Sequence, residues 1–285
     1  MSGLHAWVGW AGTHPLAVWL CGLVLATGAA GVLHAALVRG AGPRPAWPAR
    51  LPRPSGPAGL AAAMVLAAAL VWACAHTLAL IADAWGQPTT AWAVLDDGLA
   101  GTLRATASVG TLTLFAWLTH FGDTAVLFVL AAGVGLALLW RGHRMLATGW
   151  AVALAGNGLL TRAFKHSFER IRPVHTHEIA VADGFSFPSG HSSSSLVAYT
   201  MLAYLAIRLL PPRWHLPSML AAAAVIVTVG WSRVVLQVHF ASDVLGGWIT
   251  GGVWVTCCLL LLQGATRWHR LRSAAMTPAT DGALR

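Results

Sequence analysis

Residues 124–163 hold two long apolar runs joined by a short basic turn: TAVLFVLAAGVGLALLW (124–140), RGHR (141–144) and MLATGWAVALAGNGLLTRA (145–163). Each run is close to the roughly 20 residues with which an α-helix crosses the hydrocarbon core of a bilayer. Arginines in a short connection are typical of the cytoplasmic side of a membrane. This stretch therefore predicts a helical hairpin that crosses a membrane twice and turns in the cytoplasm.

The composition of the whole chain agrees with a membrane protein. Of its 285 residues, 57% are hydrophobic and 9% are charged, whereas an ordinary soluble domain has roughly 25% charged residues. So few charges exclude a soluble globular enzyme and a disordered chain. The net charge of +9 does not indicate a nucleic-acid partner, because the basic residues lie mainly in short clusters between apolar runs. The four cysteines lie inside apolar runs, without the spacing of a metal site or a disulfide framework.

We predict an all-α polytopic membrane helix bundle with seven transmembrane helices and its N-terminus outside. The first helix is expected to be retained, because no positive charge precedes it as in a secretory signal; cleavage near residues 26–30 is the alternative. The helices are expected at residues 15–38, 58–82, 124–140, 145–163, 191–209, 217–236 and 244–263.

The arginines orient these helices. Twelve of them fall in three connections and in the tail after the last helix, which are therefore predicted to be cytoplasmic. The polar segments on the other side would then face outward. They include residues 87–121, where Leu95, Leu99 and Leu103 recur at helical spacing and predict an amphipathic segment on the outer surface. Residues 105–122 lack formal charge and form an alternative further span, but this would turn two of the basic connections outward.

No internal repeat and no linker between folded units divides the chain. We expect an N-terminal transmembrane helix with a basic cytoplasmic loop at 1–57, and a six-helix membrane domain at 58–263. A basic cytoplasmic tail would follow at 264–285.

The first outer segment that carries reactive side chains is KHSFERIRP, residues 165–173. Lys165 is the only lysine of the chain and stands seven residues before Arg172. In a helix this spacing is nearly two turns, so both cations would point the same way, and Pro173 would discourage continuation. The alternative is a pair of interfacial anchors whose charged ends reach the headgroups.

The second outer segment is FPSGH, residues 187–191, directly before an apolar run. Gly190 permits close approach to the backbone, and the free N–H groups of a helix start bind phosphate. Ser189 offers a hydroxyl donor and His191 a proton donor at neutral pH. The alternative is a plain turn and helix cap.

The third outer segment runs from Ser232 to Asp243. His239 and Asp243 are four residues apart, so in a helical turn the carboxylate would lie beside the imidazole ring. It would fix the tautomer and leave the other ring nitrogen as a nucleophile. Arg233 supplies a planar fork that suits phosphate oxygens. The alternative is a structural His–Asp pair that caps the last helix.

All three segments fall at the outer ends of the predicted helices, where charged groups near a membrane are usually functional. They resemble the three-part signature of the type 2 phosphatidic acid phosphatases: Lys165-x6-Arg172-Pro173, Pro188-Ser189-Gly190-His191 and Ser232-Arg233-x5-His239-x3-Asp243. Some members of that superfamily have a second Arg-Pro after the first, where this chain has Val174-His175.

The resemblance implies a fold and a chemistry. A six-helix core would cover residues 58–263, and His239 would attack phosphorus and form a phosphohistidine. Asp243 would orient His239, and His191 would protonate the departing oxygen. The phosphate would be held by Lys165, Arg172, Ser189, Gly190 and Arg233.

The expected partner is a lipid phosphate or diphosphate in the membrane, and no metal or other cofactor is expected. His175-x-His177 is a possible zinc pair, but no further ligands complete it. A phosphotransferase that uses the same site, and an anion transporter, are the alternative functions. We expect a bacterial inner membrane protein with its site facing the periplasm. The sequence indicates neither the specific lipid nor the oligomeric state.

Overall fold

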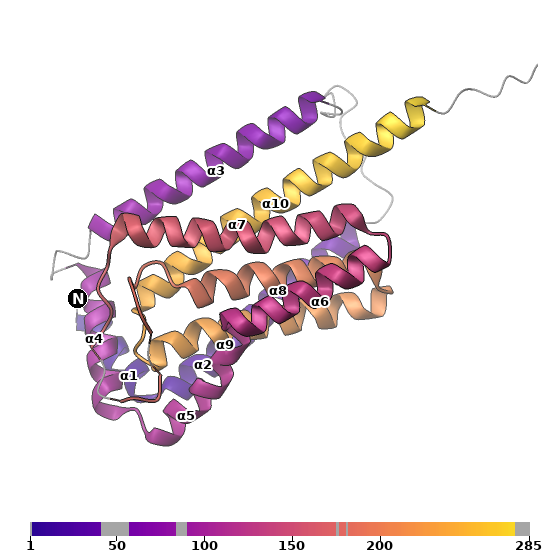
Figure 1. The fold of residues 1–285 in the computed structure, drawn as a ribbon. Helices are drawn as coiled ribbons and strands as arrows, with labels where there is room; N and C mark the ends of the chain where they lie inside the picture. Colours follow the sequence, from indigo (N-terminus) through magenta and orange to yellow (C-terminus); the bar gives the residue numbers. More distant parts are fainter. Residues whose placement is uncertain (1, 41–56, 84–89, 175–176, 181, 277–285) are drawn as a thin grey trace, which may run out of the picture.

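The computed structural model describes residues 2–40, 57–83, 90–174, 177–180 and 182–276, and this part of the chain is helices and loops without a strand (Figure 1). The all-α prediction is confirmed. The elements are α1 (Ser2–Thr13), α2 (Pro15–Gly40), α3 (Pro57–Asp83), α4 (Ala91–Thr106), α5 (Val109–Leu118), the 3₁₀ helix η1 (Thr119–Gly122), α6 (Thr124–Trp140), α7 (Arg144–Phe168), α8 (Gly190–Leu209), the 3₁₀ helix η2 (Pro212–Trp214), α9 (His215–Val235) and α10 (Ala241–Met276).

Within the described residues, five segments are long and apolar enough to cross a membrane: α2, α3, α5 together with α6, α9 and α10. The helices α7, of 25 residues, and α8, of 20 residues, are also long enough. Both carry polar side chains that lower their hydropathy, as with the four serines at the start of α8. That seven helices cross the membrane therefore stays a prediction.

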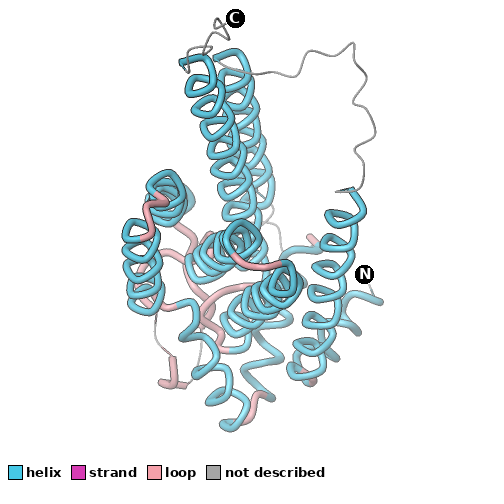
Figure 2. Tube along the Cα trace, turned by 90° about the vertical axis from the view of Figure 1, so that its right-hand side faces the viewer, coloured by secondary structure: helices cyan, strands magenta, loops and turns pink. Residues whose placement is uncertain are grey.

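The helix α8 lies within the bundle, against α7, α9 and α10. Its apolar face packs with α7 around the fully buried side chains Trp150, Val197 and Met201. Pairs of helices flank this centre: α2 lies along α9, and α3 lies along α10. In Figure 1 and Figure 2, α10 and α3 lie side by side and extend together away from the rest of the bundle.

The turn between α6 and α7 is as tight as the sequence predicts. The helix α6 ends at Trp140 and α7 begins at Arg144. Gly142 has a φ of +77°, a left-handed conformation that glycine adopts without steric cost. The hairpin predicted from residues 124–163 is thus present.

Two glycines bring α10 close to α8. A Cβ on Gly247 would meet the carbonyl oxygen of Ser189 at 2.5 Å, and a Cβ on Gly251 would meet that of Ser193 at 2.8 Å. Such distances are too short for a real side chain, so the small residues allow the two backbones to touch. This contact joins the starts of α8 and α10, where two of the predicted reactive segments lie.

The outer segment at 87–121 is two helices rather than one, and residues 87–89 lie outside the described part. The break falls at Ala107 and Ser108, because Ser108 caps α5 by accepting a hydrogen bond from the N–H of Thr111. The helix α4 is amphipathic as predicted, with Leu99 and Leu103 buried. Alone, α5 has 10 residues and is too short to span, and with α6 it forms one candidate span. The alternative of a separate span at 105–122 is therefore not supported.

The helix α1 was not predicted, and it packs on α4. Val8 and Ala11 of α1 are buried against Leu99 and Leu103 of α4. We call α1 and α4 together the cap; both lie near one end of the bundle in Figure 1.

The last helix does not end at residue 263. It continues to Met276, so residues 264–276 of the predicted tail are helical, and 277–285 lie outside the described part. Charged residues end an apolar span, but Arg, Ala and Leu all favour a helix. Most of the predicted basic loop, residues 41–56, also lies outside the described part.

Candidate active site

The loop between α7 and α8 and the loop between α9 and α10 meet at the end of the bundle near the cap. The N–H of Ser189 donates to the carbonyl of Asp243 at 2.9 Å and joins the two segments, and the N–H of Ser186 donates to the carbonyl of Arg170 at 2.7 Å within the first loop. These loops and the neighbouring helix ends border a cavity of about 1280 Å³. Six of the eight predicted site residues line it: Lys165, Arg172, Gly190, His191, Arg233 and His239.

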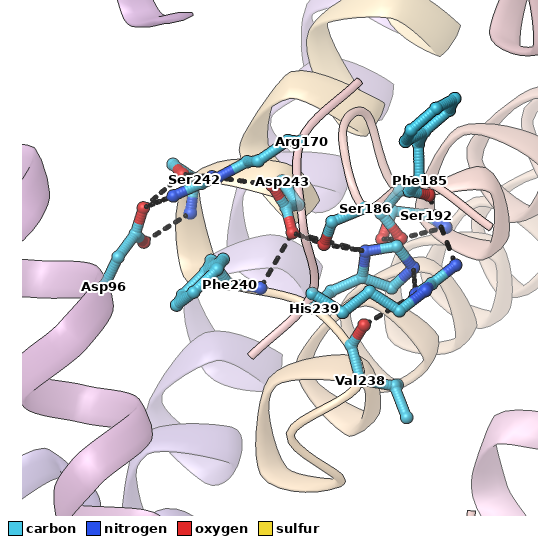
Figure 3. A network of polar contacts seen from close by, with 12 residues as sticks. Asp96, Arg170, Phe185, Ser186, Ser192, Val238, His239, Phe240, Ser242 and Asp243 are labelled. Atoms are coloured by element: carbon cyan, nitrogen blue, oxygen red, sulfur yellow. Dashed lines mark hydrogen bonds and ion pairs between the residues drawn. The ribbon is translucent and has the colours of Figure 1, made fainter. Parts of the chain in front are cut away.

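His239 and Asp243 form the predicted pair. Nδ1 of His239 lies 3.3 Å from Oδ2 of Asp243 (Figure 3). Its Nε2 lies 3.1 Å from a terminal nitrogen of Arg172. An arginine can only donate, so Nε2 accepts and the ring proton sits on Nδ1, which donates to Asp243. The unprotonated Nε2 is therefore next to the guanidinium of Arg172, a group that suits phosphate oxygens.

His239 lies in the loop before α10 and is 3% exposed. Burial, opposed by Asp243 and helped by the positive charges of Arg172 and Arg233, lowers the pKa of its imidazole to about 3. The ring is therefore neutral at pH 7. A neutral imidazole with a free lone pair on Nε2 is the form that can attack an electrophile.

The carboxylate of Asp243 is fully buried and saturated with donors. Its Oδ2 accepts from the hydroxyl of Ser186 and from the N–H of Phe240, the latter at 2.8 Å. Its Oδ1 accepts from Arg170 at 2.7 Å. Asp243 is thus held by several groups in the orientation that faces His239, and it does not line the cavity itself.

Lys165 and Arg172 come together, but not on one helix as predicted. The helix α7 ends at Phe168, and Glu169 caps it with a φ of +47°, so the chain turns before Arg172. Both cations instead converge on one acceptor: Lys165 and Arg172 each donate to the carbonyl of Phe185. The two charges are neighbours as the spacing indicated. The reason is the turn after α7, and not a shared helix face.

Arg233, near the end of α9, is 5% exposed and lines the cavity. One terminal nitrogen donates to the hydroxyl of Thr119 at 2.9 Å. Its Nε–H has no hydrogen-bond partner among the described residues. An unpaired donor of a buried guanidinium is costly, so this side chain is prepared for an anionic ligand.

Gly190, at the start of α8, lines the cavity, and its phosphate-binding N–H stays a prediction. The Ser189 hydroxyl was predicted to bind phosphate, but Ser189 does not line the cavity. Its oxygen is fully buried and accepts from the N–H of Ser192 at 3.4 Å and from the hydroxyl of Ser192 at 2.9 Å. Ser189 is therefore the N-cap of the helix, the alternative reading of this segment.

The cavity continues from this polar end into an apolar arm between α6, α7 and α8. Its walls there include Leu127, Phe128, Trp150, Leu154 and Val197. A charged end joined to an apolar arm suits a ligand with an anionic head and a hydrocarbon tail.

The sequence profile of the PAP2 superfamily matches residues 146–267, which include all the predicted site residues. Lipid A 1-phosphatase of Rhizobium etli is 30% identical over 186 residues, which cover 53% of this chain and 75% of that protein. This chain belongs to the PAP2 superfamily. Phosphatidylglycerophosphatase B of Bacillus subtilis is 34% identical over 141 residues, 47% of this chain and 66% of that protein. Decaprenylphosphoryl-5-phosphoribose phosphatase of Mycolicibacterium smegmatis is 33% identical over 143 residues, 48% of this chain and 72% of that protein.

The fold agrees with a solved PAP2 structure. The crystal structure of a transmembrane PAP2-type phosphatidylglycerolphosphate phosphatase from Bacillus subtilis has a TM-score of 0.53 and 25% sequence identity, and the match covers 72% of this chain and 98% of that chain. The chain is thus a multi-pass membrane protein of the PAP2 type.

A carboxylate that the sequence did not indicate lies beside His191, the second histidine of this PAP2 site. Nε2 of His191 lies 3.0 Å from Oδ1 of Asp123, and Oδ2 of Asp123 lies 2.6 Å from Nδ1 of His120. Asp123 and His120 come from the junction of η1 with α6, about 70 residues before His191. No local spacing could have indicated this contact.

Two further residues were missed, Arg170 and Asp96. Arg170 stands two residues before the predicted Arg172, and Asp96 lies on α4 with its side chain 2% exposed. The sequence could have indicated Asp96, because it stands three residues before Leu99 and so falls on the apolar face of an amphipathic helix. A carboxylate there needs a buried partner.

Proposed function

We propose that this PAP2 protein is an integral-membrane phosphatase that removes phosphate from lipid phosphates or diphosphates through a phosphohistidine on His239. The observation that carries the proposal is the unprotonated Nε2 of His239 beside Arg172, on a cavity that also exposes Lys165 and Arg233. The relatives named above as phosphatases of phosphatidylglycerophosphate, of lipid A and of a decaprenyl-linked sugar phosphate support a lipid substrate.

In the first step, Nε2 of His239 attacks phosphorus and the bond from phosphorus to the lipid oxygen breaks. Asp243 stabilises the positive ring through Nδ1–H. Lys165, Arg172, Arg233 and the N–H at the start of α8 would hold the equatorial oxygens, where charge is spread during phosphoryl transfer.

His191 would donate a proton to the departing oxygen, which leaves as a lipid alcohol, or as a lipid monophosphate from a diphosphate. Because Asp123 occupies Nε2, His191 would act as the imidazolium, with Nε2–H on Asp123 and the departing proton on Nδ1. Water then attacks the phosphohistidine while His191 takes its proton, so that phosphate leaves and both histidines return to their starting forms.

The apolar arm of the cavity supports a substrate that stays partly in the bilayer. Its walls are contributed by the membrane helices α6, α7 and α8. The phosphate would then reach the cations while the hydrocarbon tail remains among apolar side chains. A soluble phosphate ester would leave this arm filled with water.

The test is phosphate release from vesicles or micelles that contain phosphatidic acid, phosphatidylglycerol phosphate or undecaprenyl diphosphate, with EDTA present. Wild type is expected to release phosphate from at least one lipid, His239→Ala is expected to release none, and His191→Ala is expected to release it at least about 100-fold more slowly. The matched control is His215→Ala, a histidine at the start of α9, at the opposite end of that helix from Arg233. Release that persists in His239→Ala would reject the phosphohistidine.

The same assay separates the alternatives. A phosphotransferase would form the phosphoenzyme but require an added lipid alcohol before the phosphate is passed on. An anion transporter would move phosphate across sealed vesicles and release none from lipid. Either result would contradict hydrolysis as the function of this protein.

We also propose that the site faces the periplasmic side of a bacterial inner membrane. The support is the distribution of arginines, together with the bacterial sources of the relatives. Ser108→Cys is expected to react in whole cells with a thiol reagent that does not cross membranes, and His143→Cys to react after the cells are opened. The opposite pattern would invert the proposed orientation.

A further inference from the structure

Arg170 joins two buried carboxylates that come from distant parts of the chain. One terminal nitrogen donates to Oδ1 of Asp243 at 2.7 Å and to the hydroxyl of Ser242 at 2.6 Å, and the other donates to Oδ2 of Asp96 at 2.8 Å. Figure 3 shows the guanidinium between Asp96 on one side and Asp243 on the other. The guanidinium also lies over the ring of Phe240, 4.2 Å from its centre.

Asp96 is tied to the start of α10 as well as to Arg170. Its Oδ1 accepts from the N–H of Ser242 at 3.0 Å, and its Oδ2 also accepts from the Ser242 hydroxyl. Burial raises the pKa of the Asp96 carboxyl, and the Arg170 charge and these hydrogen bonds oppose that shift. Asp96 thus fixes both the residue next to Asp243 and the arginine that holds Asp243.

This arrangement has a geometric consequence for the nucleophile. Arg170 occupies Oδ1 of Asp243, so only Oδ2 is left to face Nδ1 of His239. A carboxylate held in this way cannot rotate without breaking a charge-assisted hydrogen bond. The ring of His239 is therefore kept in the tautomer that leaves Nε2 unprotonated.

It also has an electrostatic consequence. One guanidinium is shared between two carboxylates, so the group of three keeps one net negative charge. That charge remains available to stabilise the positive His239 ring during phosphoryl transfer. Without the charge on Asp96, Arg170 would neutralise Asp243 alone and weaken this support.

We propose that Asp96 and Arg170 are positioning residues that hold Asp243, and through it His239, in the reactive arrangement. The cap, through Asp96 of α4, is thereby part of the active site. In the cap, α1 holds α4 closely: a Cβ on Gly98 would meet Val8 at 2.9 Å, and one on Gly12 would meet Thr102 at 2.5 Å. The inference rests on the proposed role of His239 as the nucleophile.

The first experiment compares Asp96→Asn with Asp97→Asn in the full-length protein. Both substitutions remove one negative charge from adjacent positions of α4, but Asp97 is exposed. Asp96→Asn is expected to lower kcat about 10- to 100-fold with KM within about twofold, because it disturbs the alignment of a reacting group without touching substrate. Asp97→Asn is expected to match wild type. Equal kcat values for the two variants would overturn the proposal.

The second experiment separates positioning from folding. Arg170→Ala is expected to lose kcat, and added guanidinium ion at tens of millimolar is expected to restore part of it. Arg141→Ala, at the far turn between α6 and α7, is expected to behave as wild type with and without guanidinium. Loss of activity in Arg170→Ala that parallels a lower melting temperature and is not rescued would mean a structural role only, and would overturn the proposal.

The third experiment does not depend on catalysis. In ¹⁵N-histidine-labelled protein, the His239 signals, assigned by their absence in His239→Gln, are expected to report the Nδ1–H tautomer in wild type and a mixture in Asp96→Asn. An unchanged tautomer in Asp96→Asn would overturn the positioning role. If wild type releases no phosphate from any lipid, the proposed function fails, and this tautomer measurement still decides the role of Asp96.

Discussion

His239 and His191 both line the cavity and each has a carboxylate on one ring nitrogen, but the two pairs are built differently. Asp243 is four residues from His239 and is fully buried, with donors on both oxygens. Asp123 is 68 residues from His191 and is 33% exposed, and it is shared with the exposed His120. A nucleophile needs one fixed tautomer, whereas an acid that gives and takes protons needs a route to solvent. The first pair suits attack and the second suits proton exchange.

The largest expected effect is on the buried pair. Asp243→Asn keeps the shape but removes the charge and the fixed tautomer of His239, so kcat is expected to fall about 10³- to 10⁴-fold. The measurement is steady-state phosphate release from the preferred lipid, with folding checked by melting temperature. A loss smaller than that of Asp123→Asn would reverse the assignment of the two histidines.

The next effect distinguishes acid from nucleophile by the leaving group. His191→Gln is expected to lower kcat/KM about 10²- to 10³-fold on a lipid phosphate, whose alkoxide needs a proton to depart. On an aryl phosphate with an acidic phenol the loss is expected to be within about tenfold, since that group leaves without a proton. His239→Ala is expected to fail on both substrates. Equal losses for His191→Gln on both substrates would contradict its role as the acid.

A smaller effect is expected at the exposed pair. Asp123→Asn keeps the hydrogen-bonding shape but removes the charge that stabilises a protonated His191, so kcat on a lipid phosphate is expected to fall about tenfold. His120→Ala is the control: its side chain is 56% exposed, and the loss is expected to be within about threefold because water can replace it. A larger loss in His120→Ala than in Asp123→Asn would show that His120 acts on its own.

The smallest effect concerns pH and stability. Burial lowers the pKa of His239 to about 3 in the folded protein, against about 6.5 in an unfolded chain. The unfolded state therefore binds more protons between these values, so this contribution to stability is full above about pH 6.5 and is lost as pH falls toward 3. The melting temperature in detergent is expected to fall more steeply from pH 7 to 4 in wild type than in His239→Gln, whose side chain does not titrate. Parallel curves would mean that His239 is not buried in the neutral form.

The sequence determined the features that depend on local spacing and on the membrane. Apolar length and the placement of arginines predicted an all-α membrane bundle, because a bilayer permits few other structures for such runs. The interval from His239 to Asp243 predicted their pairing, although His239 lies in the loop just before α10 and not within a helical turn. The three motifs also predicted the cations of the site, although Lys165 and Arg172 meet through a turn and not along one helix.

The tertiary structure alone decided which distant residues complete the site. Asp123 reaches His191, and Asp96 reaches Arg170 and the start of α10, only because the chain folds so that these segments meet. Neither contact has a fixed interval in sequence, so no spacing rule applies. The sequence also did not predict α1, which packs on α4. Nor did it decide that the Ser189 hydroxyl caps α8. Local patterns specify helices and neighbours within a turn, whereas burial and charge pairing across the bundle depend on where the helices pack.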